Sequence, residues 1–322
     1  MEKQRQLIRD WADMRHSEFL DLDLDHTVVL LTCSPLEVHG PHLPVATDII
    51  EGDALLAATV TKIAVSRKNL AFIRLPDLFL AADVLPMRGS LAFSPKLVSL
   101  AIEELAASLA AEGFRHLWLS NFHGGPRHFL AMERAAHRAW KSHGIKVVSI
   151  FSLMVKELAD NYSLASVLSG LVPQDLQNLD ADIHAGLVET SMLLHLRPDL
   201  VDEGYRHLDD QSVWGKHEPK PGARDRVDSI WGMVTRFLGV FSYFYRFSYS
   251  GSPSLARAEI GSALIDRLAS ETAVRLFDLL DGRRSPADFH SHLWTLRILF
   301  LSNLTDKFLH VLDRRQRRKR GS

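Results

Sequence analysis

The sequence predicts an α/β protein, a three-layer α/β/α sandwich built around a mainly parallel sheet. Short apolar runs alternate with helical stretches between residues 28 and 151, and this alternation is typical of parallel strands joined by crossover helices. The chain has 322 residues, of which 46% are hydrophobic and 24% charged, as in ordinary globular enzymes. That length exceeds the usual size of a single core, so we expect one large α/β domain with appendages, or two domains.

The first half of the chain supplies the strands and the helices between them. Residues 1–25 read as an amphipathic helical segment that ends in an acidic turn. The expected strands are rich in β-branched and aliphatic residues and span 28–34, 70–75, 116–120 and 146–151. The expected helices carry apolar residues at helical spacing and span 49–65, 96–111 and 126–143.

The second half is less regular. Helices are expected at 183–196 and 254–280, so that the main domain spans 26–282 and contains an insertion-like segment at 202–250. The aromatic residues of 230–249 fit either a pocket or subunit contact, or plain core. Residues 283–322 form a helical extension with a basic tail at 314–320, which is more typical of a solvated terminus than of a nucleic-acid arm.

Global composition limits the class of protein. With 38 basic and 39 acidic residues, the net charge of −1 gives no reason to expect a nucleic-acid partner. No apolar stretch makes a comfortable membrane span, so no membrane is expected. The single cysteine, Cys33, fits a reducing compartment, and the charged start of the chain lacks the apolar segment of a secretory leader. We therefore expect a cytoplasmic protein.

Polar residues gather where the first strand ends. Glu37 and His39 follow the strand, Gly40 and two prolines exclude regular structure, and Asp48 opens the next helix. Ligands of open α/β sheets bind at such strand ends. Glutamate, histidine and aspartate together suit Zn²⁺, Mn²⁺ or Fe²⁺. The alternative is a polar turn with solvated charges.

Two later stretches carry the same residue types. His123 follows the third strand, and the two glycines after it let the backbone approach a ligand closely. His184 precedes a helix whose first turns contain Glu189. The resulting set is Glu37, His39, Asp48, His123 and Glu189, with His42 and His184 in reserve. A two-metal hydrolytic site requires such a set, because a carboxylate bridges two cations and the water between them loses a proton near neutral pH.

Three motifs resemble the creatininase (creatinine amidohydrolase) family. They are Glu-x-His-Gly-Pro-His-Leu-Pro-x-x-Thr-Asp at 37–48, Asn-x-His-Gly-Gly at 121–125 and His-Ala-Gly-x-x-Glu-Thr-Ser at 184–191. A fourth stretch, 251–261, is similar to a later block of that family. The resemblance covers about residues 25–280. It implies an α/β/α fold, two divalent metal ions and a homo-oligomer, usually a hexamer.

The resemblance also implies roles for single residues. Glu37, His39, Asp48 and His123 match the metal ligands of the family, with Asp48 bridging, and His184 matches its acid–base histidine. Creatinine-cleaving members carry a further glutamate ligand where this chain has Gly125, and we infer that Glu189 completes the site instead, as a metal ligand and part of the catalytic set.

The chain departs from creatinine-cleaving members in other places. Pro126 replaces an asparagine and Ser252 an aspartate, and both changes alter the rim rather than the metal site. The tryptophan that precedes His-Ala-Gly in those enzymes is missing from 177–183, which argues against creatinine as the substrate.

The resulting prediction is a dinuclear metal-dependent amidohydrolase. It would cleave a C–N amide bond other than a peptide bond, in a small cyclic or formylated substrate, by a metal-bridging hydroxide, and His184 would protonate the departing nitrogen. Two alternatives stay open. One is a non-catalytic scaffold or binding protein with the same fold, and the other is a metallopeptidase that trims a peptide.

Overall fold

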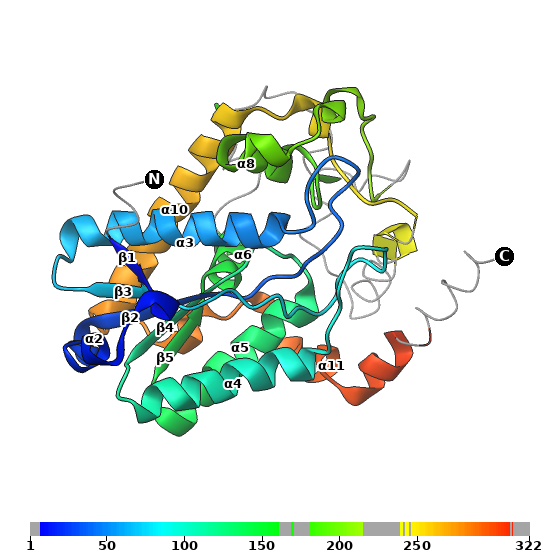
Figure 1. Cartoon of the computed structure of the whole chain (residues 1–322). Coiled ribbons are helices and arrows are strands. Elements are labelled where there is room, and N and C mark those ends of the chain that lie inside the picture. Colours follow the sequence, from blue (N-terminus) through cyan, green and yellow to red (C-terminus); the bar gives the residue numbers. More distant parts are fainter. Residues whose placement is uncertain are drawn as a thin grey trace.

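The computed structural model describes residues 7–160, 169–170, 181–214, 239–240, 242–244, 246–309 and 311 (Figure 1). A twisted sheet of five parallel strands lies at its centre, in the order β1-β3-β2-β4-β5. The strands are β1 (Ile8–Asp10), β2 (Thr27–Thr32), β3 (Ala71–Arg74), β4 (His116–Ser120) and β5 (Lys146–Ser149). The predicted parallel sheet is therefore confirmed.

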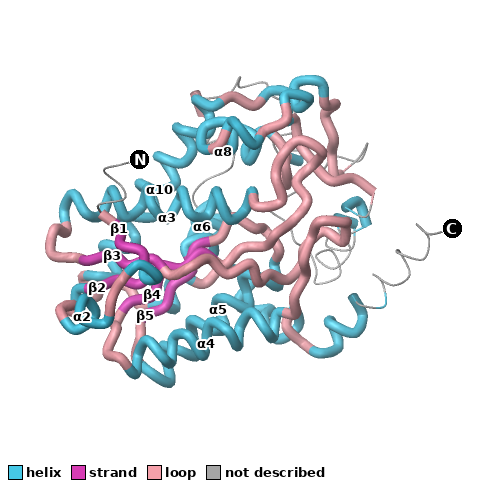
Figure 2. Tube along the Cα trace, viewed as in Figure 1, coloured by secondary structure: helices cyan, strands magenta, loops and turns pink. Residues whose placement is uncertain are grey.

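Helices cover both faces of the sheet, which gives the three layers that the sequence predicts (Figure 2). One face packs against α3 (Thr47–Ser66) and α10 (Ala258–Leu280), and α8 (Leu187–Leu196) packs on these two helices. The other face packs against α4 (Pro95–Ala111) and α5 (Pro126–His143). Alternate residues of β2 point into the two cores: Val28 and Leu30 into the first, Val29 and Leu31 into the second. All four side chains are buried, as expected for a central strand of a parallel sheet.

Local sequence signals account for the boundaries of the helices. Helix α4 begins with Ser94, whose hydroxyl accepts a hydrogen bond from the Leu97 amide, and with Pro95 in the first turn. Helix α5 begins with Pro126 and ends at Gly144, which adopts the left-handed conformation with φ of 73°.

The N-terminal segment differs from the expected helix. Ile8–Asp10 form the edge strand β1, a 3₁₀ turn follows at Trp11–Asp13, and the helix is limited to α2 (His16–Leu20). The strand pairs with β3 through Ile8 opposite Phe72, so tertiary pairing overrides the local helical pattern. A second difference lies after β5, where α6 (Ile150–Asp160) begins at once instead of the strand continuing to residue 151.

The C-terminal extension is helical only in part. It consists of 3₁₀ turns at Pro286–Phe289 and His292–Leu296, the short helix α11 (Arg297–Phe300), and helical residues 303–309. The basic tail at 314–320 lies outside the described residues, as do Trp231, Phe237, Phe241 and Tyr245 of the aromatic segment. None of the helices in the described ranges has the length and apolar character needed to cross a bilayer.

The topology brings two loops to one edge of the sheet. The ends of β2 and β4 are neighbours, with Thr32 opposite Ser120, and the Cys33 amide donates to the Ser120 carbonyl at 2.9 Å. The loop after β2 leads into α3 on one face, whereas the loop after β4 leads into α5 on the other. Such a divergence opens a crevice at the carboxyl ends of the strands.

Candidate metal centre

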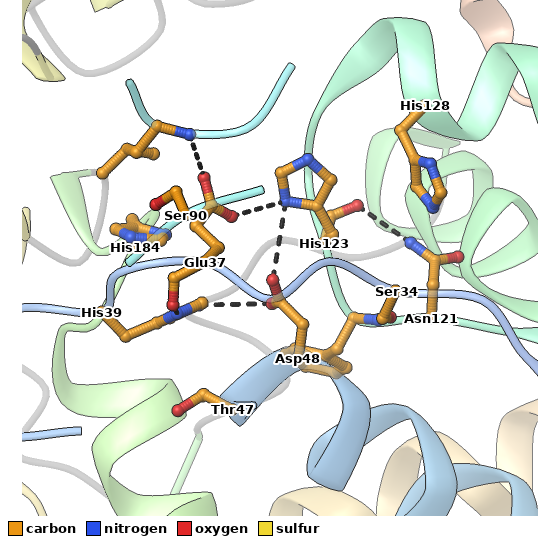
Figure 3. Close-up of polar contacts among 12 residues, drawn as sticks. Ser34, Glu37, His39, Thr47, Asp48, Ser90, Asn121, His123, His128 and His184 are labelled. Carbon is orange, nitrogen blue, oxygen red and sulfur yellow. Dashed lines mark hydrogen bonds and ion pairs between the residues drawn. The ribbon is translucent and has the colours of Figure 1, made fainter. Parts of the chain in front are cut away.

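Six predicted site residues meet in this crevice. Figure 3 shows Glu37, His39, Asp48, His123 and His184. Glu37 and His39 come from the loop after β2, and Asp48 from the first turn of α3. The loop after β4 contributes His123, and the start of α8 contributes His184 and Glu189. All six side chains are buried. They form three overlapping groups that could hold a metal ion, namely Glu37–His39–His184, Glu37–Asp48–His123 and His39–Asp48–Glu189.

The first candidate ion position centres on His123. Its Nδ1 lies 2.9 Å from Glu37 Oε2 and 3.6 Å from Asp48 Oδ2. Its Nε2 lies 2.9 Å from the Ala82 carbonyl oxygen, which can only accept, so Nε2 carries the proton in the neutral ring. The lone pair of Nδ1 is thus directed at two carboxylates, an arrangement that a shared cation would satisfy.

The second position is built in the same way around His39. Its Nδ1 donates to the Glu37 carbonyl oxygen at 3.0 Å, which leaves Nε2 as the free nitrogen. That Nε2 lies 3.3 Å from Asp48 Oδ1 and 3.8 Å from Glu189 Oε2. The two oxygens of Asp48 therefore face the two histidines separately, which is the geometry of a bridging carboxylate.

Unsatisfied polar atoms support a cation at this place. Within the described residues, the buried atoms Glu37 Oε2, His39 Nε2 and Asp48 Oδ2 have no hydrogen-bond partner. Burial lowers the pKa of His39 and His123, but the neighbouring carboxylates outweigh it and raise these pKa values to about 10 and about 9. The carboxylates thus hold protons on both rings, and divalent cations would take the place of these protons. The donor set and its geometry fit divalent metal binding.

His184 lies beside these two positions. Its ring differs in charge state from the rings of His39 and His123. Its Nε2 lies 2.8 Å from the Val38 carbonyl oxygen, so Nδ1 is the free nitrogen, and its ring centroid is 4.2 Å from that of His39. Burial, followed by the charge of His39, lowers the pKa of His184 to about 4. The ring is therefore neutral at pH 7 and can accept a proton.

Surrounding residues fix these side chains. The Asn121 side-chain amide donates to the His123 carbonyl oxygen at 2.9 Å, which fixes the backbone that carries His123. The His42 ring bonds the Thr190 hydroxyl at 2.8 Å, next to Glu189, so His42 acts as a neighbour of the site. The Thr47 hydroxyl donates to the Pro44 carbonyl oxygen, within its own turn.

The start of α8 is held by a carboxylate whose role the sequence did not reveal. Asp182 accepts hydrogen bonds from the Leu187 and Val188 amides at 2.6 and 3.1 Å, which satisfies the first turn of the helix. The glycines at 186 and 251 pack against this carboxylate, because a Cβ at either position would lie 2.5 Å from its Oδ2. Asp182 therefore places the helix that carries Glu189.

Sequence reasoning also missed Glu51 and the loop after β3. Glu51 is fully buried, and neither of its oxygens has a hydrogen-bond partner among the described residues. Burial, then the charges of Glu189 and Asp48, raise its pKa well above the ordinary value. Its spacing of three from Asp48 puts both on one side of α3, and that spacing was the available signal. The loop after β3 offered no such signal, because it acts through backbone groups of Ala82 and Leu85.

A cavity of about 390 Å³ opens from the site. Glu37, His123 and His184 line its floor, and apolar side chains line its walls. The wall includes Phe244, whose ring meets His184 edge-on at 5.3 Å, and Trp214. The aromatic residues of 230–249 were expected to form either a pocket or subunit contact, or plain core. Phe244 lines the pocket. Such a volume is typical of small-molecule sites.

Comparison with known proteins gives consistent matches. The family model described as creatinine amidohydrolase (creatininase) matches residues 12–276. A mycofactocin precursor peptide peptidase of Mycolicibacterium smegmatis is 26% identical over 250 residues, which are 77% of this chain and 84% of that protein.

Solved structures share the fold. A crystal structure of creatinine amidohydrolase (creatininase) is similar with a TM-score of 0.62 at 18% identity, covering 84% of this chain and 97% of the other. A structure named creatininase Mn has a TM-score of 0.60 at 18% identity, covering 84% and 98%.

Proposed function

The chain belongs to the creatininase family of hydrolases, and from this premise we propose that it is a dinuclear metal-dependent amidohydrolase. The single observation that carries the proposal is the placement of Asp48, whose two oxygens face the free nitrogens of His39 and His123. Glu37, Asp48 and His123 would hold one ion, and His39, Asp48 and Glu189 the other. Two divalent ions such as Zn²⁺, Mn²⁺ or Fe²⁺ would activate water and polarise the amide carbonyl.

His184 is the residue that we expect to move the proton. Its neutral ring leaves Nδ1 free, and the Val38 carbonyl fixes the ring orientation. The imidazole would accept a proton from the attacking water and pass it to the nitrogen as the C–N bond breaks. Glu189, on the same segment, would complete the catalytic set from the other side of Asp48.

The cavity sets the substrate class. Its volume of about 390 Å³ and its apolar wall around Trp214 and Phe244 fit a compact, weakly charged amide, such as a cyclic or formylated one. Creatinine itself is not favoured. At the position of a glutamate ligand, Gly125 has no room for a side chain, since a Cβ there would lie 2.4 Å from His123 Nε2. We also expect a homo-oligomer, a hexamer by analogy with the family.

A peptide bond is the second candidate. The relative from Mycolicibacterium smegmatis is named a precursor peptide peptidase and aligns over most of both chains. The chemistry at the metal ions would be the same, and only the leaving group would be larger.

The test combines metal analysis with a substrate panel of lactams, hydantoins, formamides and short peptides. Wild-type protein is expected to hold two ions per chain and to turn over one class. Asp48→Asn should lose both ions and all activity. Asp53→Asn, on the same helix but outside the metal groups, controls for the loss of a carboxylate. His184→Gln should keep both ions while kcat falls about 10²- to 10⁴-fold.

Other outcomes would contradict the proposal. If Asp48→Asn retains two ions, Asp48 does not bridge them. If His184→Gln keeps the wild-type kcat, another group moves the proton. Metal-free wild-type protein without turnover would favour the non-catalytic scaffold.

A further inference from the structure

We propose that the C-terminal extension positions the metal ligands through an ion-pair relay formed by Asp306, Arg127 and Asp83. The inference rests on the proposed function, because it assigns a role toward the ions that Glu37 and His123 would bind. The extension lies beyond residues 12–276, which match the family model, so the relay adds to the family pattern.

The relay ends on the loop after β3. There the Ala82 carbonyl oxygen accepts from His123 Nε2 at 2.9 Å, and the Leu85 amide donates to Glu37 Oε1. One short loop therefore fixes the tautomer of one expected ligand and the orientation of another. Any shift of this loop would change Glu37 and His123, two of the three expected ligands of the first ion position.

Asp83 holds the loop in an unusual conformation. Its φ of 61° lies in the left-handed region, which residues other than glycine rarely adopt. Its carboxylate accepts from the Arg127 amide at 2.7 Å and from Arg127 Nη1 at 3.4 Å. The backbone of Gly125 packs against Asp83, since a Cβ at Gly125 would lie 2.9 Å from the Asp83 Cβ. Side-chain contacts with Arg127 thus hold a backbone that would otherwise relax.

Arg127 connects the loop to the extension. It is buried in the first turn of α5, and its guanidinium pairs with Asp83 on one side and Asp306 on the other. Its Nε also donates to the Phe300 carbonyl oxygen of α11 at 3.2 Å, beside the N-terminal end of α5 (Figure 1). Without Asp306 the guanidinium would keep Asp83 and the Phe300 carbonyl oxygen but lose one charged acceptor, so its position, and with it that of Asp83, would be less tightly fixed.

A cavity of about 660 Å³ adjoins the relay, lined by the loop, Arg127 and Asp306. It shares Asp83, Val84, Leu85 and Pro86 with the catalytic pocket. The loop is thus a wall shared by two cavities. Its one charged side chain on this wall, Asp83, is held by Arg127, so we expect the position of the loop to depend on this ion pair.

The test measures metal affinity directly, with Zn²⁺ as the probe and a chelator as competitor. Asp306→Asn is expected to release one of two ions at about 3- to 10-fold lower chelator concentration, a smaller effect than the loss of a direct partner of a ligand. Asp306→Glu should restore wild-type release. Lys307→Gln, on the same turn and lining the same cavity, is the matched control and should behave as wild type.

The outcomes separate the two proposals. Wild-type protein that binds no Zn²⁺ contradicts the proposed function and the relay together. Two ions bound with equal affinity in wild type and Asp306→Asn contradict the relay alone, even if the variant melts at a lower temperature. If Asp306→Asn does not fold, Arg127→Lys is the variant to test instead. Lysine keeps the positive charge but lacks the planar guanidinium group that contacts both Asp83 and Asp306. Wild-type Zn²⁺ release by this variant overturns the relay, and earlier release of one ion supports it.

Discussion

At the scale of single residues, backbone carbonyls decide which nitrogen each histidine offers. Three carbonyl oxygens, those of Glu37, Val38 and Ala82, each accept from one ring nitrogen of a site histidine. The sequence predicts that His39, His123 and His184 converge, because each stands at the end of a strand or the start of a helix. It does not predict their tautomers, because the acceptor for His123 lies 41 residues away in the chain.

The two glycines after His123 offer a direct test of this packing. At Gly125 an added Cβ would lie 2.4 Å from His123 Nε2 and 3.0 Å from the Ala82 carbonyl oxygen, whereas at Gly124 it would meet nothing within 4 Å. Gly125→Ala should therefore lower the free energy of unfolding by about 1–3 kcal/mol and weaken metal binding. Gly124→Ala should match wild type in urea denaturation and metal titration. Equal behaviour of the two variants would contradict the close approach.

At the scale of elements, helices with strong end signals were predicted almost to the residue. Pro126 and Gly144 fix α5 at both ends, and its expected and observed bounds agree. The edge strand β1 was missed because it has only three residues, two of them charged, and its identity depends on pairing with β3. In α4, Val98 and Ile102 are buried, whereas Leu97 and Leu100 are exposed. A helix with apolar residues on two sides does not reveal which side faces the core.

Close contact between α8 and α10 gives a second test. Gly261 of α10 lies so near the backbone of α8 that a Cβ would be 2.0 Å from the Ser191 carbonyl oxygen. Gly261→Ala should force the helices apart and destabilise the protein by about 2 kcal/mol or more. Because α8 carries Glu189, we also expect weaker binding of the second ion.

The neighbouring exposed residue provides the control. Ser262→Ala should change the stability by less than about 0.5 kcal/mol. Thermal melting and chelator titration of both variants test the contact, and a Gly261→Ala protein with wild-type melting would rule it out.

At the scale of the whole molecule, the site joins segments that are far apart in the chain. Its candidate ligands run from Glu37 to Glu189, and the pocket wall extends to Phe244. The family motifs predicted which segments meet, because each motif contains residues of metal-ligand type at the end of a strand or the start of a helix. The wall was predicted only in part. The aromatic residues of 230–249, which include Phe244, fitted a pocket or subunit contact as well as plain core, whereas Trp214 lies in a stretch without periodic pattern or motif.

Buried neutral histidines make the stability of the whole fold depend on pH. Burial, then the charge of Lys146, lowers the pKa of His116 to about 4, against an ordinary value of 6.5. Between these values the unfolded chain binds the proton and the folded chain does not, so stability decreases as pH falls from 6.5 toward 4. From pH 7 to pH 5.5 this one group should remove about 1 kcal/mol.

Urea denaturation of wild type and His116→Gln at the two pH values measures this contribution. His116 opens β4, whereas the metal groups lie beyond the strand's other end, so the substitution leaves the ligands in place. The variant should lose less stability on acidification than wild type. An identical loss in both proteins would show that His116 is not neutral in the folded state.

The division between floor and wall of the catalytic cavity has an evolutionary consequence. Glu37 and His123 stand on loops anchored to the central strands β2 and β4, and His184 stands just before α8, whereas Trp214 and Phe244 lie outside the strands of the described part of the chain. Selection can therefore exchange the wall while the reactive groups stay unchanged. A scaffold organised in this way can acquire new substrates by replacing one peripheral segment, without having to rebuild its chemistry.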